Sequence, residues 1–132
     1  MILDKMADQI VPDPPYVLLV ESDQPLRERL GKALYASGFV PLLATDAADA
    51  VRYLAGASAP VLVILDLDSL GPEPAGLLAR FRADARWSRV PVVVTGSAAE
   101  LPGDLQVDGV LPKPFDAERL VSLGRESIAR PV

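Results

Sequence analysis

The stretch VLVILD at residues 61–66 decides the fold, because five apolar residues run without interruption into Asp66. A continuous apolar run of this length is typical of a strand that is buried on both faces of a sheet. The sequence YVLLV at residues 16–20 and VPVVV at residues 90–94 repeat the pattern. These three runs predict a parallel sheet that helices cover on both sides.

Helical patterns separate these runs. The first has Asp23 as its cap and Pro25 in its first turn, and it ends at Gly38. Short patterns predict a second helix over 47–54, capped by Thr45 or Asp46, and a last helix over 117–129, capped by Asp116. Between them we expect a loop from Ser69 to Gly76 and a helix that carries Leu77, Leu78, Phe81 and Trp87.

Two further strands are expected at 39–44 and 107–111, the first at a sheet edge because Pro41 cannot donate to a ladder. Five alternations of strand and helix predict an α/β fold, a flavodoxin-like doubly wound five-stranded parallel sheet of order 2-1-3-4-5. The domain is expected to span 16–130. We expect residues 1–15 to be an N-terminal extension, either a frayed tail or a docking helix with its apolar residues at helical spacing: Ile2, Leu3, Met6 and Ile10.

Composition excludes several kinds of site. The 132 residues contain neither cysteine nor histidine, which excludes disulfides, thiolate nucleophiles and zinc sites that use those ligands. With 13 basic and 18 acidic residues the net charge is −5, which argues against a direct nucleic-acid surface. No apolar run is long enough for a membrane helix, and no signal peptide is visible, so we expect a cytoplasmic protein.

Polar side chains follow the predicted strands at one edge of the sheet. In a doubly wound sheet, ligands bind outside the carboxyl ends of the strands. Two carboxylates there attract a hard cation such as magnesium, and a carboxylate beside magnesium can accept a phosphoryl group. The other interpretation is an ordinary ion pair of Asp66 with Lys113. The side chains at this edge are Glu21, Ser22, Asp66, Thr95 and Lys113.

Four segments carry a resemblance to a known family: LLVESD (18–23), VLVILDL (61–67), VPVVVTG (90–96) and GVLPKPF (109–115). From Tyr16 to about Ile128 the chain resembles the receiver domain of two-component response regulators. The resemblance implies that Asp66 accepts a phosphoryl group from a histidine kinase or phosphotransfer protein. It also implies that Thr95 and Lys113 engage the phosphoryl oxygens, that the Lys113–Pro114 bond is cis, and that the magnesium ligands are Glu21, Asp66 and the backbone carbonyl of Asp68.

The chain departs from the family pattern at several positions. Ser22 stands where the family has a second acid, which weakens magnesium binding, and Asp23 replaces that acid only if it turns inward. Val110 replaces the aromatic switch residue, and Leu70 replaces a proline in the loop after Asp66. The segment from Thr95 to Lys113 is about one turn shorter than usual and includes Pro102 and Gly103, so its helix is expected to be short or absent.

The sequence therefore predicts a stand-alone receiver that is phosphorylated on Asp66 with the help of magnesium. It would act by protein–protein contact with an unknown downstream protein, and it would not be a turnover enzyme. No effector domain is expected after residue 132. The alternative is a pseudo-receiver, an interaction scaffold that works without phosphorylation. A nucleotide or flavin enzyme is disfavoured because no glycine-rich phosphate loop follows the first strand.

Overall fold

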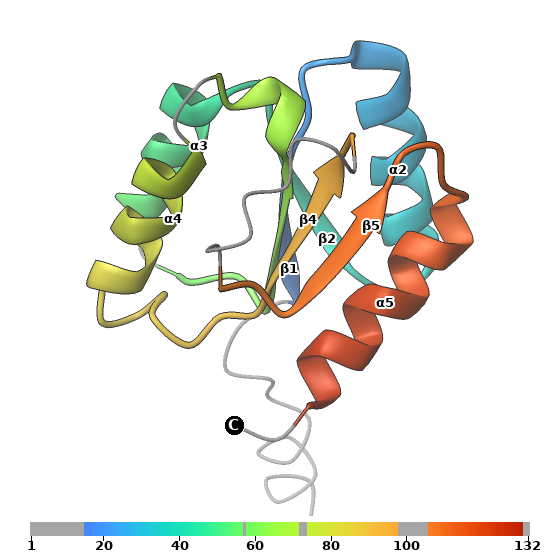
Figure 1. Ribbon diagram of the computed structural model, residues 1–132. Helices are drawn as coiled ribbons and strands as arrows, with labels where there is room; N and C mark the ends of the chain where they lie inside the picture. Colours follow the sequence, from blue (N-terminus) through green and yellow to red (C-terminus); the bar gives the residue numbers. More distant parts are fainter. Residues whose placement is uncertain (1–14, 57, 72–73, 98–105, 131–132) are drawn as a thin grey trace, which may run out of the picture.

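A computed structural model describes residues 15–56, 58–71, 74–97 and 106–130. Its centre is one sheet of five strands in the order β2-β1-β3-β4-β5, and every neighbouring pair is parallel (Figure 1). The predicted fold class and strand order are confirmed. The strands are β1 (Tyr16–Val20), β2 (Val40–Ala44), β3 (Leu62–Asp66), β4 (Val92–Gly96) and β5 (Gly109–Pro112).

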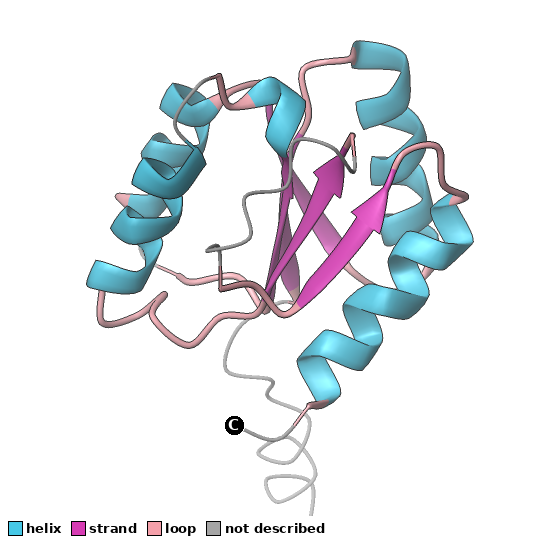
Figure 2. Ribbon diagram, in the orientation of Figure 1, coloured by secondary structure: helices cyan, strands magenta, loops and turns pink. Residues whose placement is uncertain are grey.

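Helices cover both faces of the sheet, as Figure 2 shows. One face carries α2 (Gln24–Ala36) and α5 (Ala117–Ala129), and the other carries α3 (Ala47–Leu54) and α4 (Pro74–Ala83). Each described helix falls short of the length and apolar character that a membrane span requires. The layered arrangement leaves the ends of the strands as the places where polar groups from several elements can meet.

Both faces of the central strands are apolar, and this produces two separate clusters of buried side chains. Successive residues of a strand point to opposite faces. In β3, Val63 and Leu65 therefore join the cluster beneath α3 and α4, whereas Leu62 and Ile64 join the cluster beneath α2 and α5. The continuous apolar run in this strand reflects burial on both sides, as the sequence predicted.

The helix starts follow local capping chemistry. The Asp23 carboxylate accepts a hydrogen bond from the Leu26 N–H at 3.0 Å, and Pro25 lies in the first turn of α2. At α3 the sequence left two caps open, and Asp46 is the one that accepts, from the Asp49 N–H at 2.8 Å. Asp116 occupies the cap position of α5, but its side chain makes no capping hydrogen bond.

Two predictions around α4 are wrong. The loop expected from Ser69 to Gly76 is interrupted, because Leu67–Ser69 forms a 3-10 turn and α4 already begins at Pro74. Proline is tolerated in a first helical turn, where its missing N–H has no partner to lose. Trp87 lies outside the helix, in the turn that follows Ala83, although its ring still stacks on Phe81 with centroids 5.2 Å apart.

Other boundaries differ by one or two residues. Strand β4 begins at Val92 and not at Val90, and β5 begins at Gly109 and not at Val107. Pro41 lies in β2 at the edge of the sheet, as expected. The predictions for the N-terminal extension and for a short helix after Thr95 fall largely on residues 1–14 and 98–105, which are outside the described residues.

Candidate functional site

The carboxyl ends of four parallel strands meet at one end of the sheet, toward which the arrowheads of β4 and β5 point in Figure 1. Glu21 directly follows β1, Asp66 ends β3 and Thr95 lies near the end of β4. The register places Asp66 beside Thr95 across β3 and β4. Lys113 directly follows β5, and its backbone N–H bonds to the Gly96 carbonyl at 3.0 Å.

The Lys113 ammonium lies between two buried carboxylates. Its Nζ is 3.0 Å from Oδ1 of Asp66 and 3.1 Å from Oε1 of Glu21, and each carboxylate side chain is only 2% exposed. The Thr95 hydroxyl donates to the same Oδ1 of Asp66 at 3.4 Å. The structure thus brings together four of the five side chains that the sequence singled out, from positions far apart along the chain.

Ser69 is a member of this site that sequence reasoning missed. Its hydroxyl oxygen lies 2.5 Å from Oδ2 of Asp66, 3.2 Å from Oε2 of Glu21 and 2.9 Å from the hydroxyl oxygen of Ser22. It also accepts a hydrogen bond from the Ser22 N–H at 2.8 Å. In a 3-10 turn, residues three apart lie on the same side, so a hydroxyl three residues after Asp66 was the available signal.

The neighbouring acidic residues have different positions. Oδ1 of Asp23 caps α2, so its side chain does not take the place of the family's second acid. The Asp68 carboxylate is 40% exposed and lies 3.8 Å from the Lys113 ammonium, at the margin of the site. Ser22 is exposed, yet its hydroxyl and its N–H both face Ser69.

The backbone around the site is held in a defined shape. The Arg27 guanidinium donates to the carbonyls of Glu21 at 2.9 Å and Ser22 at 3.3 Å, which fixes the segment after β1. The Lys113–Pro114 peptide bond is cis, as the resemblance implied. Val110, at the position of the family's aromatic switch residue, is 44% exposed.

Burial and neighbouring charged groups shift the pKa values of Glu21 and Lys113. Burial raises the pKa of Glu21, and the nearby Asp66 carboxylate adds to this, although the Asp23 N–H and Lys113 pull it back. Burial alone would lower the pKa of Lys113, but hydrogen bonds to Asp66 and Glu21 outweigh it and raise that pKa. Lys113 therefore stays charged at neutral pH.

The donor set suits a hard cation only in part. Among the described residues, acidic side chains do not gather in a group of three that could hold a metal ion. Two carboxylate oxygens, Oε2 of Glu21 and Oδ2 of Asp66, nevertheless face one point, since both lie within 3.2 Å of the Ser69 hydroxyl. Carboxylate oxygens of this kind are the ligands that magnesium takes in proteins, supplemented by carbonyl, hydroxyl or water oxygens.

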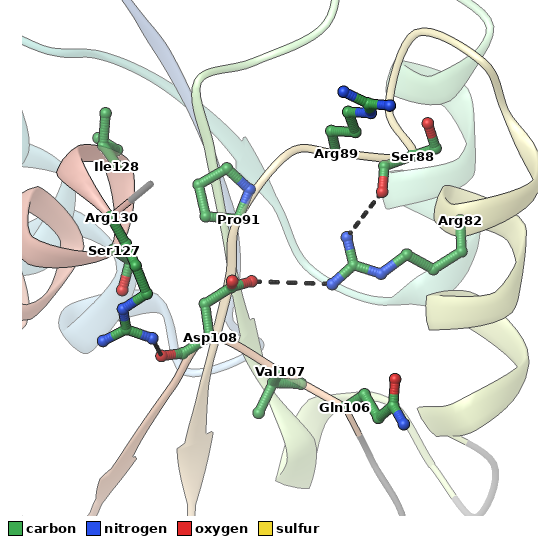
Figure 3. A pocket seen from close by; sticks show the side chains of 10 residues that line it. All are labelled: Arg82, Ser88, Arg89, Pro91, Gln106, Val107, Asp108, Ser127, Ile128 and Arg130. Atoms are coloured by element: carbon green, nitrogen blue, oxygen red, sulfur yellow. Dashed lines mark hydrogen bonds and ion pairs between the residues drawn. The ribbon is translucent and has the colours of Figure 1, made fainter. Parts of the chain in front are cut away.

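A second hollow lies away from this site and contains several arginines (Figure 3). Its volume is about 410 Å³. Arg82 donates to the carbonyls of Ser88 and Val90, and Arg130 donates to the carbonyl of Asp108. The Asp108 carboxylate accepts from the Val92 N–H at 2.7 Å. These groups connect β4, β5 and the helix ends, so we assign the hollow a structural role.

Comparison with known proteins gives relatives in sequence but no matching family model. Protein PetR of Rhodobacter capsulatus is 31% identical over 110 residues, covering 82% of this chain and 46% of that protein. Response regulator Rre1 of Synechocystis is 34% identical over 125 residues, covering 89% of this chain and 53% of that protein. The chain thus spans about half the length of the curated relatives that it matches.

Solved structures share the fold. The chemotaxis response regulator CheY4 of Vibrio cholerae matches with a TM-score of 0.76 at 19% identity, over 87% of this chain and 99% of that one. The receiver domain of the sensor histidine kinase PA1611 of Pseudomonas aeruginosa also matches with a TM-score of 0.76, at 22% identity, over 89% and 100% of the two chains. That structure is described with a magnesium ion in its active site cleft.

The raised pKa of Glu21 predicts a pH-dependent stability. In the folded protein the Glu21 carboxyl group keeps its proton at pH values above 4.5, which is the ordinary pKa of glutamate. In the unfolded chain the same group loses its proton near pH 4.5. The folded state thus binds more protons in this range, and the wild-type free energy of unfolding falls as pH rises through it. Glu21→Gln has no carboxyl group at this position, so its free energy of unfolding lacks this decrease. Urea unfolding measured from below pH 4.5 to neutrality should therefore show the variant becoming more stable relative to wild type as the pH increases.

Glu28→Gln is the control for this comparison, because it removes one carboxylate from an exposed position on α2. We expect its difference from wild type to change little over the same range of pH. A difference between Glu21→Gln and wild type that stays constant with pH would contradict the raised pKa.

Proposed function

By its fold and by its sequence similarity to curated relatives, this chain is a receiver domain of the response-regulator type, and we propose that Asp66 accepts a phosphoryl group. One observation carries the proposal: the Lys113 ammonium contacts Oδ1 of a carboxylate that is almost fully buried. A buried acid that is paired with an ammonium group at the carboxyl end of a central strand is typical of a functional site in this kind of fold.

In the proposed reaction the Asp66 carboxylate attacks the phosphorus of a phosphohistidine. A bond forms between a carboxylate oxygen and phosphorus, the phosphorus–nitrogen bond breaks, and the histidine leaves with the bonding electron pair. The product on this chain is an acyl phosphate. The Lys113 ammonium and the Thr95 hydroxyl already lie at Oδ1, so both are within reach of the charge that the new group brings.

Magnesium fits the opposite oxygens of the acidic pair. Glu21 and Asp66 would hold it through Oε2 and Oδ2, together with the Ser22 hydroxyl and the backbone carbonyl of Asp68. A bound magnesium ion offsets negative charge on the phosphoryl oxygens. Ser22 brings a neutral oxygen where the family has a carboxylate, and this predicts weaker magnesium binding.

The partners follow from the chemistry. The phosphoryl donor is a histidine kinase or a phosphotransfer protein in a cytoplasmic relay, and the output is contact with a downstream protein and not turnover or direct nucleic-acid binding. Val110 has no aromatic ring to rotate inward, so the output does not use that movement. The Ser69 hydroxyl lies within hydrogen-bonding distance of both Glu21 and Asp66, so the acidic pair has a partner in the absence of metal and phosphate. This favours a second candidate, a pseudo-receiver scaffold that works without phosphorylation.

Acetyl phosphate, a small phosphoryl donor, tests the proposal in the presence of magnesium. Intact-protein mass spectrometry should show the mass of one added phosphoryl group on wild type and no addition on Asp66→Asn, because Asp66 is the buried acid that both Lys113 and Thr95 contact. Asp68→Asn is the matched control: its carboxylate is exposed at the margin of the site, so this variant should still be phosphorylated. An unmodified wild type would favour the pseudo-receiver, and a modified Asp66→Asn would show that a residue other than Asp66 accepts the group; either result contradicts the proposal.

A second prediction concerns the missing acid. Ser22→Asp restores a charged oxygen beside Ser69 and the acidic pair, so it should tighten magnesium binding by about tenfold, equivalent to about 1.4 kcal/mol. Isothermal titration calorimetry with magnesium chloride measures the change. Asp23→Asn is the control, because that side chain caps α2. Unchanged affinity in Ser22→Asp would show that position 22 does not contribute to the metal pocket.

A further inference from the structure

We propose that the Ser69 hydroxyl competes with a divalent cation for the acidic pair, and so sets how much magnesium the site needs. This inference rests on the proposed function, because the pocket is the one in which Asp66 would be phosphorylated. It assigns Ser69 a positioning role through Asp66 and Glu21, with no direct contact to the reacting phosphorus.

The two carboxylates divide their oxygens in the same way. Oδ1 of Asp66 and Oε1 of Glu21 face the Lys113 ammonium, at 3.0 and 3.1 Å. Oδ2 of Asp66 and Oε2 of Glu21 face the Ser69 hydroxyl, at 2.5 and 3.2 Å. The oxygens left for a cation are therefore the two beside the hydroxyl, and Oε2 of Glu21 also accepts from the Asp23 N–H at 3.1 Å.

The hydroxyl of Ser69 has one proton to donate and two lone pairs to accept with. Oδ2 of Asp66, at 2.5 Å, is its nearest acceptor, and a short O–H···O⁻ distance marks a charge-assisted hydrogen bond, so the proton goes to Asp66. The Ser22 N–H, at 2.8 Å, takes one lone pair, and the Ser22 hydroxyl, at 2.9 Å, takes the other when it donates.

This inventory commits the proton of the Ser69 hydroxyl to Asp66 and one of its lone pairs to the Ser22 N–H. The hydroxyl is therefore a competitor for Oδ2 and not a ready ligand for the cation. Magnesium binding in the pocket must first break a charge-assisted hydrogen bond, which is worth more than one between neutral groups. Without metal, this hydrogen bond satisfies Oδ2 of Asp66, the Asp23 N–H donates to Oε2 of Glu21 at 3.1 Å, and Lys113 contacts the remaining oxygen of each carboxylate.

Local structure holds the hydroxyl in this position. Ser69 is the last residue of the 3-10 turn that follows Asp66, which places it one tight turn away on the same side as the carboxylate. The Ser22 N–H fixes the hydroxyl from the segment after β1. The two serines thus join the ends of two neighbouring strands next to the acidic pair.

The test is a magnesium chloride titration of wild type, Ser69→Ala and Ser69→Thr, followed by the amide NMR signals of residues 66–68. Ser69→Ala should bind magnesium about tenfold more tightly, because one charge-assisted hydrogen bond no longer competes. Ser69→Thr keeps the hydroxyl and should bind as wild type does. Ser69→Gly removes the same hydroxyl and repeats the test if the alanine variant does not fold.

Three results would overturn the proposal: equal affinity in Ser69→Ala and wild type, weaker binding in Ser69→Ala, which would make the hydroxyl a ligand, or no binding by either protein. Acetyl phosphate treatment of the same proteins separates this inference from the proposed function. Tighter magnesium binding by Ser69→Ala with no phosphorylation of any protein would leave the competition intact and reject the phosphoacceptor. Phosphorylation of wild type with no gain in Ser69→Ala would do the reverse.

Discussion

One ammonium group, that of Lys113, holds the end of the sheet together by pairing with two carboxylates that are almost fully buried. Two such acids close together repel each other and lose their hydration, so each depends on a nearby cation. Lys113 is 92 residues from Glu21 along the chain, and only the 2-1-3-4-5 sheet order brings them within 3.1 Å. Removing Lys113 leaves both carboxylates buried without their cation, which is why fold and site depend on the same contact.

Such an arrangement is poor as a source of stability, because the cost of removing charges from water offsets much of their attraction. Its value lies in the chemistry that it makes available. The ammonium and the Thr95 hydroxyl meet one oxygen of Asp66, and the Ser69 hydroxyl meets the other. The carboxylate thus has one side suited to phosphoryl oxygens and one side suited to a cation, and the second side is the one at which the sequence departs from its family.

The apolar pattern of the sequence predicted the three central strands, because short continuous apolar runs between helical patterns are typical of strands buried on both faces. The edge position of β2 and the start of α2 were also predictable, because each depends on a local property of one residue, Pro41 in β2 and Asp23 at α2. Trp87 was misplaced because a helical spacing of apolar residues cannot show that the chain turns after Ala83 and still returns the ring to Phe81.

The site was predictable as far as strand ends determine it, which covers Glu21, Asp66, Thr95 and Lys113. Ser69 was not, because its role depends on a 3-10 turn in a segment whose prolines and glycines suggested an open loop. The roles of Ser22 and Asp23 also required structure. Only the observed cap shows that the Asp23 carboxylate is engaged by α2, and only the observed contacts show that Ser22 faces the pocket.

The most direct measurement of the central claim is a double-mutant cycle between Lys113→Met and Asp66→Asn, read by urea unfolding at neutral pH. Groups in direct contact show a coupling free energy of about 0.5–3 kcal/mol, and the buried contact of 3.0 Å predicts at least about 1 kcal/mol. Losses that add to within about 0.3 kcal/mol would contradict the account, because Lys113 and Asp66 would then contribute independently.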